Sequence, residues 1–193
     1  MRSQDRRESI IAAATEVFGR YGFVGATTDQ VAQAAGVSQP YVVRMFGSKQ
    51  RLFLDVLDRD VTLLLATLRE AIHHDSEVPI SCRLELAYRG LLADRGLLSS
   101  LMHAFVLGAD PVIGPVARSS FIAVHTFLRT EAGLSIDEAQ AFLAAGMMTN
   151  TMIGIRMADE YESNTAAREL LEGAFSDSLE YALAANGTGG GEA

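Results

Sequence analysis

Cysteine is almost absent from this sequence of 193 residues, and long apolar runs are missing altogether. The single cysteine, Cys82, excludes an internal disulfide and a cysteine-rich zinc site. No run approaches the roughly 18 apolar residues that a membrane span requires, and the charged stretch from Arg2 to Glu8 lacks the apolar core of a signal peptide. We therefore expect a cytosolic protein without a membrane partner, a metal or a cofactor.

The residues that are present favour a packed core and an uneven surface charge. Hydrophobic residues make up 49% of the chain and charged residues 21%, which is ample for a core. The net charge is −8, but residues 1–51 hold seven basic and four acidic residues, whereas the remainder holds nine and twenty. A basic end on an acidic body suits a protein that turns one end toward phosphates.

Apolar residues recur at helical spacing along almost the whole chain, and no segment alternates as a half-buried strand does. We therefore predict an all-α protein of about nine helices. The first ends at Gly22 and carries Ile10, Ile11, Ala14, Val17, Phe18 and Tyr21 on its apolar face. The others are expected at residues 28–35, 38–46, 48–73, 80–94, 97–107, 110 to about 133, 136–159 and 163–185, and Ser135 with Glu138 forms a capping box for the eighth.

Two short helices joined by a glycine turn lie near the N-terminus. Thr27 with Gln30 forms a capping box that opens the first of them, and Gly36 supplies the tight turn that follows. Ser38 is expected to cap the second helix, where Pro40 falls in the first turn and its missing N–H costs little. This pair has the dimensions of a helix-turn-helix.

The segment from Arg7 to Leu54 closely resembles the TetR family of repressors and reads RESIIAAATEVFGRYGFVGATTDQVAQAAGVSQPYVVRMFGSKQRLFL. The resemblance lies in the apolar pattern of the first helix, Gly22, Thr27 and Thr28, the run from Ala35 to Ser38, and Phe46 with Ser48 and Lys49. It implies a helix-turn-helix domain at 1–50 and a helical ligand-binding and dimerisation domain at 51–186. The glycine-rich composition of residues 187–193 predicts a disordered tail. The implied function is that of a dimeric repressor, which binds a palindromic operator in double-stranded DNA and is released by a small apolar or amphipathic effector.

The second short helix is the expected reader of the DNA sequence, because a recognition helix presents its N-terminal side chains to the major groove. Gln can pair with adenine, Arg with guanine, and an apolar ring can contact a thymine methyl. The resemblance places base contacts at Gln39, Pro40 and Tyr41 and phosphate contacts at Thr28 and Lys49. The full set of predicted DNA-binding residues is Thr27, Thr28, Ser38, Gln39, Pro40, Tyr41, Arg44, Ser48 and Lys49.

Some positions depart from the family pattern. Val43 and Met45 stand where many members have Tyr and His, and Asp29 stands where some have a base-reading Arg. We hypothesise that Tyr41, one turn before Arg44 on the same face, replaces the lost phosphate contact. The alternative interpretation of the segment is a surface helix pair with no role in DNA binding.

A density of methionine and aromatic residues in the second half suggests an adaptable apolar pocket. Met148 and Phe127 belong to this group, and ordinary core packing is the alternative for each member. Arg156 could orient a ligand or pair with Glu160 one turn away. The predicted ligand-binding residues are Met102, His103, Phe105, Phe121, His125, Met147, Asn150 and Met152.

Helix-turn-helix proteins usually bind DNA as dimers, because they contact two half-sites about 34 Å apart. The expected homodimer surface is formed by the last two helices, 136–159 and 163–185. In the resembled family these helices form a four-helix bundle with those of a second copy. The residues proposed for this contact are Gly146, Thr149, Asn150, Gly154, Phe175, Leu179 and Leu183, and core packing within one chain is the alternative. The helix at 48–73 would pass the effector signal to the DNA reader.

Other functions are weaker candidates. His73 and His74 are adjacent and therefore point about 100° apart on a helix, while His103 and His125 lack a Glu-x-x-His pattern. No Ser, His and Asp grouping is visible, so we predict that the chain is not an enzyme, with a small all-α enzyme as the alternative. A DNA-binding activator, a ligand-independent regulator and a protein-interaction module also stay open.

Overall fold

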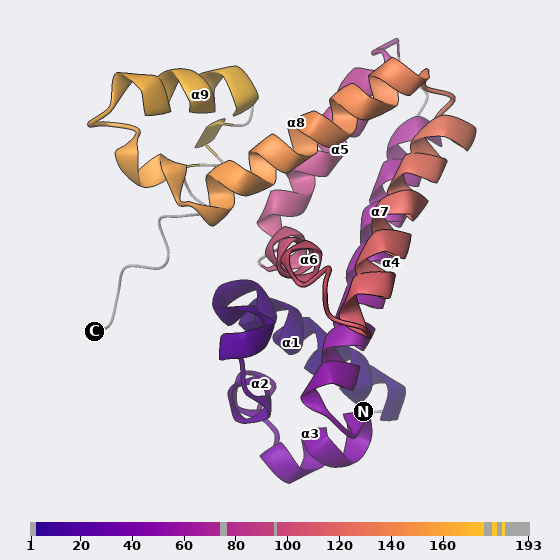
Figure 1. The fold of residues 1–193 in the computed structure, drawn as a ribbon, viewed down its shortest axis with the longest axis vertical. Helices are drawn as coiled ribbons and strands as arrows, with labels where there is room; N and C mark the ends of the chain where they lie inside the picture. The colour runs from indigo at the N-terminus through magenta and orange to yellow at the C-terminus, as the bar shows by residue number, and fades with distance from the viewer. Residues whose placement is uncertain (1–2, 74–76, 95, 176–178, 181–182, 184–193) are drawn as a thin grey trace. The chain divides into compact units, whose positions relative to one another are not determined.

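The computed structural model describes residues 3–73, 77–94, 96–175, 179–180 and 183, and in these residues the fold is entirely helical (Figure 1). The prediction of an all-α protein is therefore confirmed. The predicted tail at 187–193 lies outside the described residues, as does most of the last predicted helix beyond 175. The described helices are α1 (Ser3–Gly25), α2 (Thr28–Ala34), α3 (Gln39–Phe46), α4 (Lys49–His73), α5 (Ile80–Gly90), α6 (Leu97–Val106), α7 (Ile113–Thr130), α8 (Ile136–Gly154) and α9 (Thr165–Phe175), with two 3₁₀ turns, η1 (Leu91–Ala93) and η2 (Met157–Glu160).

The chain divides into two compact units whose boundaries fall within α4 and α7. Unit one comprises residues 1–66 and 95–124, and unit two comprises residues 67–94 and 125–193. The charge follows this division: unit one holds ten basic and eight acidic residues, and unit two holds six basic and sixteen acidic residues. Their formal net charges are therefore +2 and −10.

The core of unit one is built on the apolar face of α1. Ile10, Ile11, Ala14, Val17 and Phe18 are all buried, as their helical spacing predicts. Tyr21 departs from the prediction because it is 44% exposed, and the guanidinium of Arg20 lies over its ring. The ring of Phe18 packs edge-on against Phe53 of α4, which joins the two helices through their aromatic side chains.

The predicted end of the first helix at Gly22 is wrong by three residues. Gly22 has a φ of 67° and a ψ of 170°, so it interrupts the helix as expected, but the chain resumes helical geometry as far as Gly25. The carbonyl of Gly22 accepts a hydrogen bond from the amide of Ala26, which closes the extra turn. The glycine therefore kinks α1 instead of ending it.

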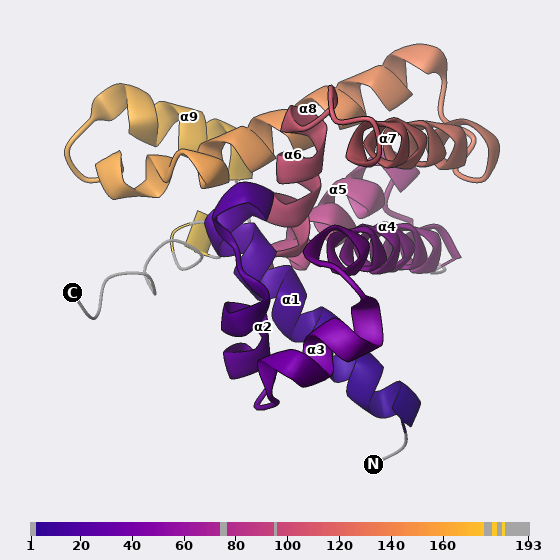
Figure 2. The ribbon, with the colours of Figure 1, turned by 60° about the horizontal axis from the view of Figure 1, so that its bottom comes forward.

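Helix α6 packs on α1 at a very short distance within unit one (Figure 2). A Cβ added at Gly19 would lie 2.4 Å from Cα of Gly96, and a Cβ added at Gly96 would lie 2.4 Å from the carbonyl oxygen of Thr15. Further along, the imidazole of His103 lies against Gly22 at the kink. Such a close approach requires that neither position carries a side chain, so the glycines at 19 and 96 allow α6 to pack on α1.

A fully buried carboxylate, Asp60 of α4, joins three helices of unit one. It accepts hydrogen bonds from the hydroxyls of Thr15 on α1, at 3.2 Å, and Ser100 on α6. The guanidinium of Arg59 lies 3.4 Å from the same carboxylate. Because a buried charge is costly unless it is hydrogen-bonded, this network favours one arrangement of α1, α4 and α6.

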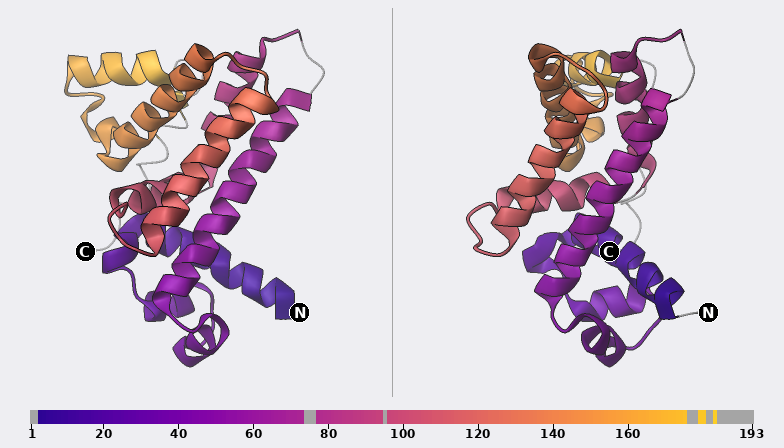
Figure 3. Two further views of the ribbon diagram at one scale, coloured as in Figure 1. Left: turned by 45° about the vertical axis from the view of Figure 1, so that its right-hand side comes forward. Right: turned by 90° about the vertical axis from the view of Figure 1, so that its right-hand side faces the viewer.

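Unit two has its own small core. Met152 of α8 packs with Leu171, Ala174 and Phe175 of α9, and Leu92, Ile153, Met157 and Tyr161 surround this cluster. In the same unit the ends of α4 and α7 lie side by side (Figure 3), where Arg69 donates to the two carboxylate oxygens of Glu131 at 2.7 and 2.8 Å. This bidentate pair lowers the pKa of Glu131 below its usual value.

Several helix ends differ from their predictions for local reasons. The helix expected to begin at Asp110 begins at Ile113, because the Asp110 carboxylate caps the amides of Val112 and Ile113 at 2.8 Å. The helix expected to reach 159 ends at Gly154. Arg156 then adopts a left-handed φ of 55° and forms an ion pair with Asp159 at 2.8 Å, whereas pairing with Glu160 was one of the two alternatives offered by the sequence.

Within the described part of the chain, none of the helices combines the length and apolar character that crossing a membrane needs.

Candidate functional site

Helices α2 and α3 form the predicted helix-turn-helix (Figure 2). The capping box is present: the Thr27 hydroxyl accepts from the amide of Gln30, and the Gln30 side chain accepts from the amide of Thr27 at 2.8 Å. Gly36 makes the turn with a φ of 64°, which favours glycine. Val31 and Ala32 of α2 are buried with Val42 and Phe46 of α3 in the unit-one core, so the remaining faces of the two helices are free for another partner.

The face of α3 opposite Val42 and Phe46 carries the predicted base-reading residues. Ser38, Pro40 and Arg44 are exposed, and Gln39 and Tyr41 are half-buried. The Arg44 guanidinium lies 5.2 Å from the centre of the Tyr41 ring, which confirms that they share one face.

The residues at the start of α3 are held by α2. The Gln39 amide nitrogen donates to the Thr28 hydroxyl at 3.2 Å, so two predicted DNA-binding residues contact each other. Ser38 occupies the N-cap position, but its side chain makes no capping hydrogen bond, contrary to our expectation. Its carbonyl accepts from the amides of Tyr41 and Val42, and the residue is exposed.

Lys49 and Ser48 lie where α4 begins. The Ser48 hydroxyl accepts from the amide of Arg51 at 3.1 Å and so caps α4 as predicted. The Lys49 ammonium donates to the carbonyls of Val24 at 3.3 Å and Ala26 at 2.9 Å. The same ammonium lies 4.8 Å from the centre of the Phe23 ring, so Lys49 fixes the end of α1 to the start of α4.

The eight predicted ligand-binding residues fall in both units. In unit one, Met102, His103 and Phe105 lie on α6, and Phe105 packs edge-on against Phe121 of α7 at 5.6 Å. In unit two, Met152 belongs to the core, Asn150 accepts a hydrogen bond from Tyr88 at 3.0 Å, and Met147 and His125 are half-buried. Phe105 and Phe121 thus contact each other within unit one, and the ligand-binding role of the set stays a prediction.

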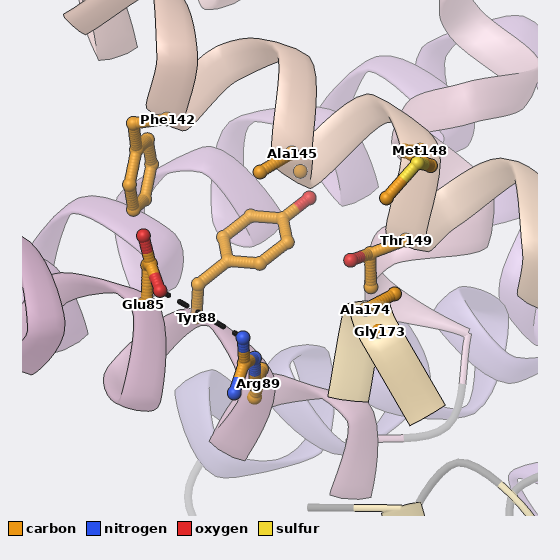
Figure 4. Close-up of a pocket in the computed structure, with 10 residues that line it drawn as sticks. Glu85, Tyr88, Arg89, Phe142, Ala145, Met148, Thr149, Gly173 and Ala174 are labelled. Atoms are coloured by element: carbon orange, nitrogen blue, oxygen red, sulfur yellow. Dashed lines mark ion pairs between the residues drawn. The ribbon is translucent and has the colours of Figure 1, made fainter. Parts of the chain in front are cut away.

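A pocket of about 210 Å³ lies elsewhere in unit two, and the sequence analysis missed it (Figure 4). Of the methionine and aromatic group discussed above, only Met148 lines it. A sequence signal for this pocket does exist, because lining residues are spaced three and four apart on α5 and on α8. On α5 this spacing places Glu85, Tyr88 and Arg89 on one helix face. The lining residues are Glu85, Tyr88, Arg89, Phe142, Ala145, Gly146, Met148, Thr149, Gly173 and Ala174.

The residues proposed for a dimer contact are partly interior in the single chain. Phe175 is fully buried, and Thr149 and Asn150 are 6% and 7% exposed, so core packing accounts for these three. The exposed apolar side chains of α8, its C-terminal end and α9 are instead Ile136, Met148, Ile155 and Leu170. Leu179 is half-buried and packs against the core cluster of unit two, and Leu183 is half-buried.

Among the described residues, no three His, Cys, Asp or Glu side chains are grouped so that they could hold a metal ion. His74, one of the adjacent pair considered in the sequence, lies outside these residues.

Comparison with known proteins agrees with the geometry of the helix-turn-helix. Residues 10–56 match the family described as "Bacterial regulatory proteins, tetR family". The HTH-type transcriptional activator FasR of Mycolicibacterium smegmatis is 41% identical over 68 residues, which cover 35% of this chain and 31% of that protein. The HTH-type transcriptional regulator RutR of Escherichia coli K12 is 34% identical over 64 residues, which cover 33% and 30%. The chain thus spans about a third of the length of the curated relatives it matches.

The whole chain also has a structural counterpart. A TetR-like transcriptional regulator from Rhodococcus sp. RHA1 superposes with a TM-score of 0.60 at 18% identity, over 96% of each chain. The two chains therefore share one fold, an N-terminal helix-turn-helix followed by a helical C-terminal region. Residues 10–56 therefore resemble the N-terminal segment of the TetR family.

Proposed function

We propose that this chain is a cytoplasmic transcriptional regulator that binds a palindromic operator in double-stranded DNA as a homodimer. The observation that carries the proposal is the exposed N-terminal face of α3, where Ser38, Pro40 and Arg44 project from a helix anchored by buried Val42 and Phe46. The similar proteins named above are all transcriptional regulators, which favours this function over a small enzyme. The positive charge of unit one, beside the strong negative charge of unit two, suits a DNA-facing role for the former.

In this proposal α3 enters the major groove, and the side chains of α3 and of the start of α4 have two different roles. Arg44 reads guanine, while Gln39, Pro40 and Tyr41 contact neighbouring bases. The hydrogen bond from Gln39 to Thr28 limits the conformations of Gln39 before it meets DNA. Ser48 and Lys49 contact phosphates, since the Lys49 ammonium has three N–H groups and its two carbonyl partners leave one available.

The homodimer would form through α8 and α9. Ile136 and Ile155, at the two ends of α8, are 56% and 60% exposed, and Leu170 of α9 is 46% exposed. Exposed apolar side chains on two consecutive helices fit the four-helix contact that the sequence resemblance implies. A dimer is also what a palindromic operator requires.

We propose repression, lifted by a small effector, as the direction of regulation. A specific observation favours the alternative of activation, because FasR is a transcriptional activator. Transcription from the promoter next to the operator distinguishes repression from activation. Deleting the gene for this protein should raise transcription if the protein is a repressor and lower it if the protein is an activator.

The test of DNA reading is equilibrium binding of the full chain to the duplex upstream of its own gene and to a scrambled duplex, across a salt series. Arg44→Ala is expected to weaken operator binding by about 1 to 3 kcal/mol, because one base-edge contact is worth that much. The scrambled duplex should bind the variant nearly as well as it binds the original chain.

Arg44→Lys provides the matched control. It keeps the positive charge but loses the planar guanidinium, so the salt dependence should stay while operator preference falls. An equal loss of affinity for both duplexes in Arg44→Ala would assign Arg44 to a phosphate instead of a base. Binding that does not weaken with salt would contradict the proposal itself.

A further inference from the structure

Thr149 of α8 belongs to the lining of the pocket in unit two. Thr149 is 6% exposed and lines the pocket, and no hydrogen bond of its hydroxyl occurs within the described residues. Helical threonines usually donate to the carbonyl four residues earlier, as Thr151 does to Met147 at 2.8 Å and Thr130 does to Thr126 at 2.8 Å. Because Thr149 lines the pocket, its hydroxyl can donate a hydrogen bond to a molecule inside it.

The centre of the pocket offers a second polar atom, the hydroxyl oxygen of Tyr88 (Figure 4). This hydroxyl donates to Asn150 at 3.0 Å, and burial raises the pKa of Tyr88 to about 12, so it stays protonated at neutral pH. Its proton is engaged, but its lone pairs can still accept a hydrogen bond. Thr149 and Tyr88 together can donate one hydrogen bond to a ligand and accept one from it.

The walls around these two atoms are apolar and aromatic. The Phe142 ring stands at 79° to the Tyr88 ring with centres 5.7 Å apart, and Met148, Ala145 and Ala174 complete the walls. A flat ring can pack against such surfaces, and a methionine sulfur makes favourable contacts with aromatic rings.

Charge and size narrow the class of ligand. The charged lining residues are Glu85 and Arg89, an ion pair at 3.7 Å that contributes no net charge, and unit two carries −10 as a whole. An anion would therefore be repelled. The volume of about 210 Å³ is smaller than the roughly 300 Å³ at which pockets for drug-sized ligands begin.

We infer that this pocket binds a small uncharged aromatic molecule with one hydroxyl group, such as a simple phenol. The ligand hydroxyl accepts from Thr149 and donates to Tyr88, and its ring packs between Phe142 and Met148. The inference deepens the proposed function, on which it rests for the role of the ligand as effector, and it moves the ligand site away from the residues predicted from the sequence.

The experiment is calorimetric titration of the full chain with p-cresol, with toluene and with benzoate, in the absence of DNA. Toluene matches the ring but lacks the hydroxyl, and benzoate tests the exclusion of anions. Thr149→Val keeps the shape of the side chain and removes its hydroxyl. We expect it to weaken p-cresol binding about tenfold, which is the worth of one hydrogen bond, and to leave toluene binding unchanged.

A second pair of variants tests the position of the pocket. A Cβ at Gly173 would meet nothing within 4 Å, so Gly173→Leu extends into the pocket without displacing the helix and should abolish binding of both p-cresol and toluene. Gly154→Leu is the matched control, because Gly154 also has open space but does not line the pocket, and it should bind as the original chain does. Circular dichroism confirms that each variant is folded.

The inference is overturned if p-cresol shows no saturable binding, if benzoate binds as tightly, or if Thr149→Val leaves p-cresol affinity unchanged. Because these titrations contain no DNA, a negative result would overturn the ligand inference without bearing on the proposal that the chain binds DNA. A chain that binds p-cresol through Thr149 but does not bind any operator would refute the regulator and leave the pocket established.

Discussion

Gly96→Ala is expected to lower the free energy of unfolding by about 3 to 5 kcal/mol. Two costs add at this position. Gly96 has a φ of 97°, which an alanine adopts only under strain. The new Cβ would also lie 2.4 Å from the Thr15 carbonyl oxygen and 2.9 Å from Cα of Glu16, both of them backbone atoms that cannot rotate away. Urea unfolding followed by circular dichroism measures the change.

Two other glycines separate these costs. Gly36 has a φ of 64° but open space around its Cβ position. Gly36→Ala should therefore lower the free energy of unfolding by about 1 kcal/mol, through backbone strain alone. Gly19 lies in α1 without a positive φ, so Gly19→Ala tests the contact with Gly96 alone and should cost about 1 to 3 kcal/mol. Equal losses for Gly96→Ala and Gly36→Ala would show that α6 does not approach α1 as closely as described.

Ser100→Ala is expected to cost about 2 to 3 kcal/mol, the second largest effect that we predict. The Ser100 hydroxyl is fully buried and donates to the Asp60 carboxylate. Without the Ser100 hydroxyl, the fully buried Asp60 carboxylate still contacts the Thr15 hydroxyl and the Arg59 guanidinium but loses a close hydrogen-bond donor. Hydrogen bonds to charged groups are stronger than those between neutral groups, so the loss exceeds that of an ordinary serine.

Ser119 is the matched control for this variant. In both serines the hydroxyl oxygen lies 2.9 Å from the carbonyl oxygen three residues earlier, but Ser119 is exposed and no carboxylate among the described residues accepts from it. Ser119→Ala should therefore change the free energy of unfolding by less than about 0.5 kcal/mol. Combining Ser100→Ala with Asp60→Asn should give a smaller loss than the sum of the two, and strict additivity would mean that the two residues do not interact.

The local part of the fold could be predicted because its signals are themselves local. The boundaries of α2 and α3 agree with the prediction to within one residue, and both capping boxes are present, Thr27 with Gln30 and Ser135 with Glu138. A capping box needs residues only three positions apart, so the sequence contains the whole interaction. The same holds for the buried face of α1.

The predicted helix boundaries are wrong where contacts between distant residues or an unusual backbone conformation determine where the helix begins or ends. Nothing near Gly22 indicates that the helix resumes after the kink, and Arg156 takes a left-handed conformation without the glycine that usually marks one. Asp110 was recognised as the start of a helix, but the two amides that its carboxylate caps place that start at Ile113.

In the candidate sites, too, features set by nearby residues could be predicted and features set by distant contacts could not. Residues of α3 could be assigned because they lie within one short helix of known dimensions. The attachment of Lys49 to the carbonyls of Val24 and Ala26 spans more than twenty positions and could not be read from the sequence. The pocket combines α5, α8 and α9, whereas composition alone pointed to methionines and phenylalanines that mostly lie elsewhere.

The central claim is that α3 reads a DNA sequence, and the most direct measurement is the ratio of dissociation constants for the operator and for a scrambled duplex of equal length. The measurement is made with the full chain at one physiological salt concentration. The account predicts a ratio of about 1,000 or more in favour of the operator, as specific DNA readers show. Equal affinities for the two duplexes would contradict it, because phosphate contacts alone would then account for all of the binding.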